Sequence, residues 1–210
     1  PDSLCSEPPG FMVDDTTIVE YGLFSDLTPP IKIQFCDDDT ENYNCINYTD
    51  PADSSKGQLD IYMTNLPACS YCEDPIYNNN AIGWVGQRDA CEISWGGNST
   101  WVVNTGMTKT ECDNVPSMAE TGGWWFDGNV GGIQFYIKGV KVTEFLSGSA
   151  VSTFNLLQLN DNADCDADGI ADEGCNLIMA TSMSGQTIQP SVGQLFLSIA
   201  FEDYNDTEIC

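Results

Sequence analysis

The chain has 210 residues, 32 acidic against 6 basic side chains, no histidine and a formal net charge of −26. So acidic a chain is a poor partner for nucleic acid or an anionic membrane surface, because binding to phosphates depends on Lys and Arg. Without histidine, neither a Ser-His-Asp nor a Cys-His catalytic arrangement is possible. No apolar run reaches the roughly 20 residues that a membrane span requires. The length suffices for one domain with a sizeable core.

The cysteines favour an oxidising compartment. An even number of cysteines without histidine is typical of disulfide bonds rather than zinc ligands, and the ten are Cys5, Cys36, Cys45, Cys69, Cys72, Cys91, Cys112, Cys165, Cys175 and Cys210. Three N-glycosylation sequons, at Asn47, Asn98 and Asn205, agree with secretion. The start at Pro1, without initiator Met or apolar leader, suggests a mature or trimmed piece of a longer precursor. We therefore expect an extracellular or cell-surface protein.

The first part of the chain predicts short β-strands, because β-branched and aromatic runs alternate with Gly, Pro, Asn and Asp. The expected strands are 16–23, 31–35 and 59–63, and the polar stretch 37–56 is expected to be a loop or linker. Strand 31–35 can pair within its own chain or with the edge of a neighbouring subunit. We expect residues 1–56 to form N-terminal strands and a linker that pack on, or swap into, a β-domain over residues 57–210.

Residues 66–122 form an irregular insert that is too long for an ordinary loop. Short strands are expected at 81–85 and 99–103, and disulfides among Cys69, Cys72, Cys91 and Cys112 are expected to pin the insert. Five tryptophans, which are able to stack on sugars, lie in or near it: Trp84, Trp95, Trp101, Trp124 and Trp125. Because neighbours in a strand point to opposite faces, at least one of the last two is expected in the core.

The second half predicts strands at regular intervals, separated by turn residues. They are 132–137, 140–145, 154–159, 176–182 and 194–201. No long segment keeps a helical apolar period, so long helices are not expected. The fold class predicted is all-β, an antiparallel β-sandwich of jelly-roll or cohesin-like type, rich in disulfides and carrying the long irregular insert.

Two segments resemble cohesin-like sandwich modules of secreted microbial and algal proteins. Residues 131–140 (GGIQFYIKGV) are similar to a strand pair of these modules, and residues 187–196 (TIQPSVGQLF) are similar to their turn and closing strand. Residues 59–63 then correspond to the opening strand, whereas the insert departs from the pattern. The resemblance implies a module that binds or assembles rather than one that catalyses.

The acidic loop within residues 161–176 predicts a calcium site. Its candidate ligands are the side chains of Asp164, Asp166, Asp168 and Asp172 and the main-chain carbonyl of Ile170, with the Ile170 side chain packed inward. Calcium takes six to eight oxygen ligands, and acids at alternate positions of a tight turn aim several carboxylates at one point. Gly169 allows the sharp reversal. Four aspartates in nine residues repel one another unless a divalent cation neutralises them.

This loop resembles thrombospondin type 3 and dockerin loops, but it departs from an EF-hand. Cys175 stands where an EF-hand has its bidentate glutamate. Glu173, Asn176 or Asp161 can supply the missing oxygen, and Cys165 and Cys175 bracket the loop. We expect a structural Ca²⁺ site of extracellular affinity, about 10⁻⁴ to 10⁻³ M or somewhat tighter.

Three functions remain open. The first is a non-catalytic, calcium-stabilised structural glycoprotein that assembles with itself or with neighbouring extracellular subunits into a fibre or surface layer. The second is an adhesion module that binds carbohydrate or protein, as cohesin-like modules do. The third, which we favour least, is an acid hydrolase with a carboxylate pair, because no spacing singles out such a pair. We therefore predict no enzyme and no membrane insertion.

Overall fold

The structure is a computed structural model that describes residues 10–12, 18–20, 31–35, 46–50, 53–79, 88, 90–92, 99–118, 120–164, 170–172 and 174–204. Strands dominate these residues. The strands are β1 (Gly10–Met12), β2 (Ile18–Glu20), β3 (Ile31–Phe35), β4 (Ile46–Asp50), β5 (Asp53–Asn65), β6 (Ala68–Cys72), β7 (Trp101–Asn104), β8 (Trp124–Phe126), β9 (Gly132–Lys138), β10 (Lys141–Ser147), β11 (Leu156–Asn160), β12 (Cys175–Thr181) and β13 (Gln194–Glu202). Short helical turns join some of them: η1 (Pro75–Tyr77), α2 (Lys109–Asp113) and α3 (Ser149–Thr153).

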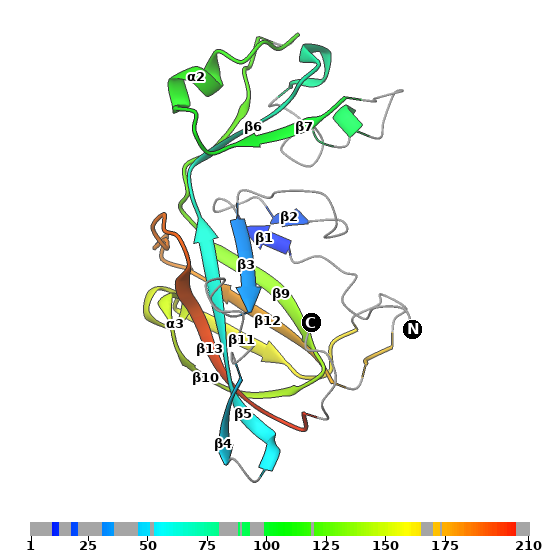
Figure 1. The fold of residues 1–210 in the computed structure, drawn as a ribbon, viewed down its shortest axis with the longest axis vertical. Helices are drawn as coiled ribbons and strands as arrows, with labels where there is room; N and C mark the ends of the chain where they lie inside the picture. Colours follow the sequence, from blue (N-terminus) through cyan, green and yellow to red (C-terminus); the bar gives the residue numbers. More distant parts are fainter. Residues whose placement is uncertain are drawn as a thin grey trace.

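The strands form antiparallel sheets (Figure 1). One five-stranded sheet has the order β11-β12-β9-β1-β2, and a second has the order β10-β13-β5-β3, with β4 also paired to β5. A three-stranded sheet, β7-β6-β8, lies at one end of the long axis. The prediction of a β-rich, disulfide-containing chain is thus confirmed.

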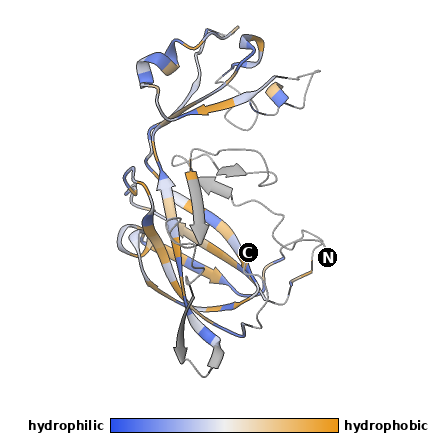
Figure 2. Cartoon of the chain, viewed as in Figure 1, coloured by the Kyte–Doolittle hydropathy of each residue, from blue (hydrophilic) through white to orange (hydrophobic). Residues whose placement is uncertain are grey.

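The second half of the chain folds as its alternating pattern predicts. β9 to β13 each begin and end within two residues of the expected strands. Their inward-facing residues contribute to one buried cluster that draws on both larger sheets, and the rings of Phe135 on β9 and Phe196 on β13 lie 6.2 Å apart. Hydrophobic residues are spread along these strands (Figure 2). The period of two therefore placed the core correctly.

The polar stretch 37–56 is not all loop or linker, and that prediction was wrong for its second half. β4 pairs with β5 from Ile46↔Leu59 to Asp50↔Asp53, so β5 begins well before the strand expected at 59–63. The polar composition concealed the alternation of Ile46 and Tyr48 with polar neighbours, a pattern that suits a strand with one solvated face. β5 thereby becomes a long strand, paired with β13 on one edge and with β3 and β4 on the other.

The N-terminal strands pair within their own chain. β3 pairs with β5 from Ile31↔Asn65 to Phe35↔Ile61, and β1 pairs with β9. Ile31 is buried in the core. In this structure residues 31–35 are thus part of the same sheet as β5 and β13 of their own chain.

Within the insert, β6, β7 and α2 form a small ordered lobe together with β8, which directly follows the insert; Figure 1 shows β6, β7 and α2 at the end of the molecule. Two disulfides, Cys69–Cys112 and Cys72–Cys91, hold it together, as predicted. The strand expected at 99–103 appears as β7, whereas 81–85 lies outside the described residues. The insert is thus less irregular than its composition indicated.

A buried asparagine, Asn65, holds together the end of β5, Gly128 and residues 189–191. We call this region, where the lobe joins the larger sheets, the neck. Asn65, the last residue of β5, donates through Nδ2 to the carbonyl oxygens of Gly128 (2.6 Å) and Gln189 (3.0 Å), and its Oδ1 accepts from the Ser191 amide (3.2 Å). Gly128 has a φ of 87°, and a Cβ there would lie 2.5 Å from a Pro190 side-chain atom. Glycine is therefore the residue that fits position 128 without strain.

Among the described residues, no helix has the length and apolar character needed to cross a membrane.

Candidate functional site

The acidic loop that joins β11 to β12 has a closed base. The β11–β12 ladder ends at Asn160↔Leu177, and beyond it the Ala163 amide donates to the Cys175 carbonyl (3.3 Å). The Asp172 amide then donates to the Ala163 carbonyl (2.9 Å). The main chain therefore returns at Asp172 to a point next to Asp164, which brings the first and last predicted ligand positions together.

Apolar contacts and a disulfide fix this base. Ala163 and Cys175 are buried, at 3% and 1% exposed, and Tyr136 and Leu177 pack against them. Cys175 is disulfide-bonded, and its partner lies outside the described residues. A loop held at both ends loses less conformational entropy on binding a ligand than a free segment does.

The structure describes only some of the predicted calcium ligands. Asp164 and Asp172 stand at the closed ends, whereas Asp166 and Asp168 lie outside the described residues. The Ile170 side chain is 68% exposed, so the expectation that it packs inward was wrong. Within the described part of the chain, no group of three or more His, Cys, Asp or Glu side chains could hold a metal ion.

One substitute for the missing EF-hand glutamate is excluded. The Asn176 side chain is 1% exposed, its Oδ1 accepts from the Val142 amide (3.0 Å), and its Nδ2 donates to the Val140 carbonyl (2.7 Å) and the Ile137 carbonyl (3.0 Å). These contacts lock the β9–β10 turn and leave Asn176 no role as a metal ligand. Asp161 is exposed at the end of β11 and remains a candidate, and Glu173 lies outside the described residues.

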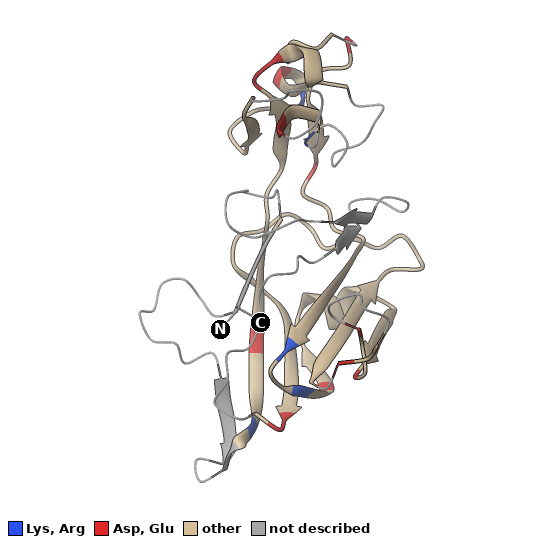
Figure 3. Ribbon diagram, turned by 90° about the vertical axis from the view of Figure 1, so that its right-hand side faces the viewer, with Lys and Arg blue, Asp and Glu red and all other residues tan. Residues whose placement is uncertain are grey.

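A surface ion pair lies near the loop at the same end of the larger sheets. Lys141 Nζ donates to Glu202 Oε1 at 2.7 Å, linking β10 to β13. This hydrogen bond raises the pKa of Lys141, with smaller contributions from the charges of Asp203 and Asp161, and it lowers the pKa of Glu202. Figure 3 marks the positions of Lys and Arg in blue and those of Asp and Glu in red along the described ribbon.

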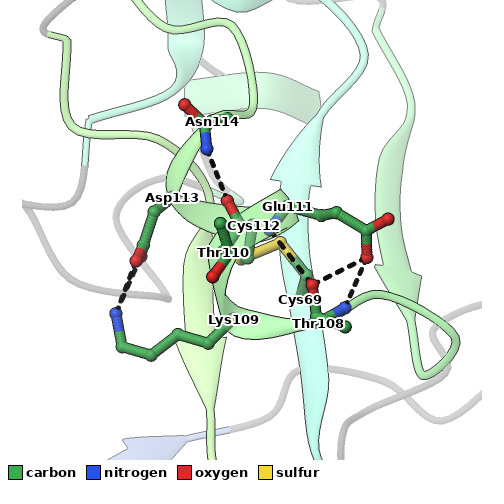
Figure 4. Close-up of polar contacts among 8 residues, drawn as sticks. All are labelled: Cys69, Thr108, Lys109, Thr110, Glu111, Cys112, Asp113 and Asn114. Carbon is green, nitrogen blue, oxygen red and sulfur yellow. Dashed lines mark hydrogen bonds and ion pairs between the residues drawn. A yellow bond between two sulfur atoms is a disulfide. The ribbon is translucent and has the colours of Figure 1, made fainter.

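The small lobe has a capped helix next to one of its disulfides (Figure 4). The Thr108 hydroxyl accepts from the Glu111 amide (3.3 Å), and Glu111 Oε2 accepts from the Thr108 amide (2.8 Å). This capping box satisfies amides that the helix leaves free. Hydrogen bonds from the Thr108 backbone and side chain lower the pKa of Glu111. Cys112 in the same helix is bonded to Cys69, so α2 is fixed to β6.

Trp124 and Trp125 point to opposite faces of the small sheet, as predicted. Trp124 is opposite Ser70, packs against the core cluster and stacks on Phe126, with ring centroids 6.4 Å apart. Trp125 is opposite Cys69 and half-buried, and it shares its face with Tyr71 two residues along β6. Trp101 is buried, whereas Trp84 and Trp95 lie outside the described residues.

Most of the predicted modification sites fall outside the described residues. They include Asn98, Asn205, Cys5, Cys36, Cys45, Cys165 and Cys210. Asn47 lies in β4, opposite Gln58. The two described disulfides are typical of an oxidising, extracellular environment.

No protein-family model matches the chain, and comparisons with curated proteins and with solved structures give no match either. The resemblance to cohesin-like modules and to thrombospondin type 3 or dockerin loops therefore stays a prediction.

Proposed function

We propose that the chain is an extracellular, calcium-stabilised structural glycoprotein module that assembles with itself or with neighbouring extracellular subunits into a fibre or surface layer. The closed base of the acidic loop carries this proposal. The hydrogen bond from the Asp172 amide to the Ala163 carbonyl brings the loop ends together next to buried, disulfide-bonded Cys175. The proposal assigns no catalytic role to the chain.

The donor chemistry of the loop suits calcium. Carboxylates and a main-chain carbonyl are hard oxygen ligands, which Ca²⁺ prefers over the nitrogen and sulfur ligands typical of zinc. Asp164 and Asp172 at the closed ends, with Asp166, Asp168 and the Ile170 carbonyl between them in sequence, supply such oxygens. Exposed Asp161 is one further oxygen source. In this role Ca²⁺ neutralises the aspartates and holds the end of β11 close to the start of β12.

The proposed architecture is the two-layered sandwich of a cohesin-like module. In support, residues of β5 and β13 in one larger sheet and of β9 and β12 in the other belong to the same buried cluster. The strands that the resembling segments reach, β5, β9 and β13, all take part in these two sheets. The small lobe is an addition between β5 and β9, joined at the neck held by Asn65.

Assembly and its dependence on calcium test this function. Purified chain is examined by sedimentation velocity and electron microscopy over a concentration series, in millimolar Ca²⁺ and in EGTA. We expect ordered assemblies in Ca²⁺ that disperse with the chelator. A particle that stays monomeric in Ca²⁺ at every protein concentration would contradict the proposal.

A second candidate function, carbohydrate binding, is favoured by one observation. Trp125 and Tyr71 lie on the same face of the small sheet, opposite the face that packs on the core, and both are half-buried. Partly exposed aromatic side chains that combine an apolar ring with a polar group are suited to binding surfaces. Isothermal titration with a panel of neutral oligosaccharides, using Trp125→Ala as the variant and Tyr62→Ala on β5 as the control, tests it. Absence of heat from all sugars would remove this candidate.

A further inference from the structure

We infer that the outer edge of β11 is a self-association surface, at which two copies of the chain pair antiparallel about a two-fold axis at Gln158. This inference rests on the proposed assembly function and names the contact that would bring it about. It follows from the pairing, the charge and the side-chain pattern of this one strand.

β11 is an edge strand in the part of the chain that the structure describes. It pairs with β12 over five residue pairs, from Leu156↔Thr181 to Asn160↔Leu177, and no other described strand pairs with it. The opposite edge therefore presents main-chain N–H and C=O groups. Such a row is a template for a further strand from another molecule.

Among the described edge strands of the two larger sheets, β11 is the one without a charged residue, a property that it shares with β7 and β8 at the edges of the small sheet. β11 has the sequence LLQLN and no charged residue, in a chain with a formal net charge of −26. β10, at the end of the other larger sheet, has exposed Lys141 and Glu144. Charged side chains are the usual protection of an edge against unwanted pairing. The absence of any charge on β11 leaves this edge open to a second copy.

A two-fold axis at Gln158 gives a self-complementary register. Gln158 then faces its own counterpart, and Leu157 faces the counterpart of Leu159. Leu157 and Leu159 are half-buried and pack against the core, whereas Gln158 is exposed on the other face. The apolar layer thus continues across the axis, and the two glutamine amides can hydrogen-bond to each other on the outer face. The same surface serves both copies, as in most homodimers.

This register also separates the acidic loops. Asp161 follows β11 directly, so in the paired strands it lies opposite Asn155 of the second copy. The two Asp161 residues are then six strand positions apart, about 20 Å at roughly 3.4 Å per residue. That distance exceeds the Debye length of about 8 Å at physiological ionic strength, so repulsion between the loops is screened.

Charge substitution at the axis tests the interface. Gln158→Lys places two like charges face to face in the dimer while leaving the residue exposed in a single copy, and Gln158→Glu does the same with the opposite sign. We expect each variant alone to weaken self-association at least tenfold in sedimentation equilibrium, and an equimolar mixture of the two to restore it. Thr143→Lys, at an exposed position of β10, is the matched control and is expected to associate as the unmodified chain does.

Two results would overturn the inference while leaving the proposed assembly intact. One is self-association of Gln158→Lys at the level of the unmodified chain, and the other is an equal weakening by Thr143→Lys. An unmodified chain that stays monomeric in Ca²⁺ would instead overturn the proposed function, and this interface with it. Circular dichroism and the melting temperature of each variant verify that the fold is intact.

Discussion

Two buried asparagines hold together segments that lie far apart in the sequence. Asn65 joins the end of β5 to Gly128 and to residues 189–191, and Asn176 joins the start of β12 to the β9–β10 turn. Both side chains are at most 1% exposed. A polar residue at an inward position of a strand is a signal readable from the sequence, but its partners are not, because they depend on the tertiary fold. This is why Asn176 was considered as a calcium ligand and proved to be a structural residue.

Replacing Asn65 with alanine tests the neck. The variant leaves the carbonyls of Gly128 and Gln189 and the Ser191 amide without their partner. Because an unsatisfied buried polar group costs about 1–3 kcal/mol, we expect the free energy of unfolding to fall by roughly 3 kcal/mol. Denaturant unfolding measures this, with Asn114→Ala as the control, because Asn114 is exposed and its side chain donates to the Thr110 carbonyl. Equal effects of the two substitutions would contradict the role given to Asn65.

The Lys141–Glu202 pair predicts a pH dependence at both ends of the scale. The pKa of Glu202 is lowered from 4.5, so its contribution to stability is present above that pH and is lost as the pH falls through the lowered value. The pKa of Lys141 is raised from 10.5, so its contribution is present below that pH and is lost as the pH rises through the raised value. The effect is small because both side chains are solvated.

Glu202→Gln measures this contribution. The variant is expected to melt slightly below the unmodified chain between these two pH limits, and the difference is expected to vanish in strong acid, in strong alkali and at high salt. Thermal melts across the pH range are the measurement, with Glu144→Gln, which lies on the same strand as Lys141, as the control. A difference in melting temperature that does not vary with pH or salt would rule out the ion pair as its cause.

At the scale of elements, strands with a regular apolar period could be predicted from the sequence. Polar composition alone led to a wrong prediction for the second half of residues 37–56. β9 to β13 follow alternating apolar residues whose inward face is the core, so local pattern and tertiary burial agree. β4 and the start of β5 lie in polar sequence, and they are recognised by the ladder that pairs them with each other. The cysteines predicted that disulfides hold the insert together. Which cysteines pair, Cys69–Cys112 and Cys72–Cys91, is known only from the structure.

The small lobe is expected to depend on its disulfides more than the larger sheets do. Cys69–Cys112 closes a loop of 43 residues, and chain entropy alone gives such a crosslink about 4 kcal/mol. In a Cys69→Ala/Cys112→Ala variant we expect hydrogen exchange to increase in β6, β7, β8 and α2, while β9, β12 and β13 stay protected. Equal loss of protection in all of these strands would show that the lobe and the sheets unfold as one unit.

At the scale of the whole molecule, the chain combines a strongly acidic composition with disulfides, which suggest an oxidising, extracellular environment. A net charge of −26 favours solubility but makes the compact state repel itself, so a bound divalent cation would stabilise it. Disulfides fix the small lobe, and the acidic loop is placed to fix the end of β11, the edge at which we infer that two copies meet. Calcium in that loop would thus stabilise the fold and order the contact surface together.

The melting temperature with and without calcium tests the central claim most directly. Calorimetry in Ca²⁺ at about 100 times its Kd is compared with calorimetry in EGTA, for the unmodified chain, for Asp164→Asn/Asp172→Asn and for Glu144→Gln as the control. Binding to the folded state alone stabilises by about 2.7 kcal/mol under these conditions, so the unmodified chain and Glu144→Gln are expected to melt several degrees higher in Ca²⁺. The double variant is expected to lose that difference. An unmodified chain that melts at the same temperature in Ca²⁺ and in EGTA would contradict a structural calcium site.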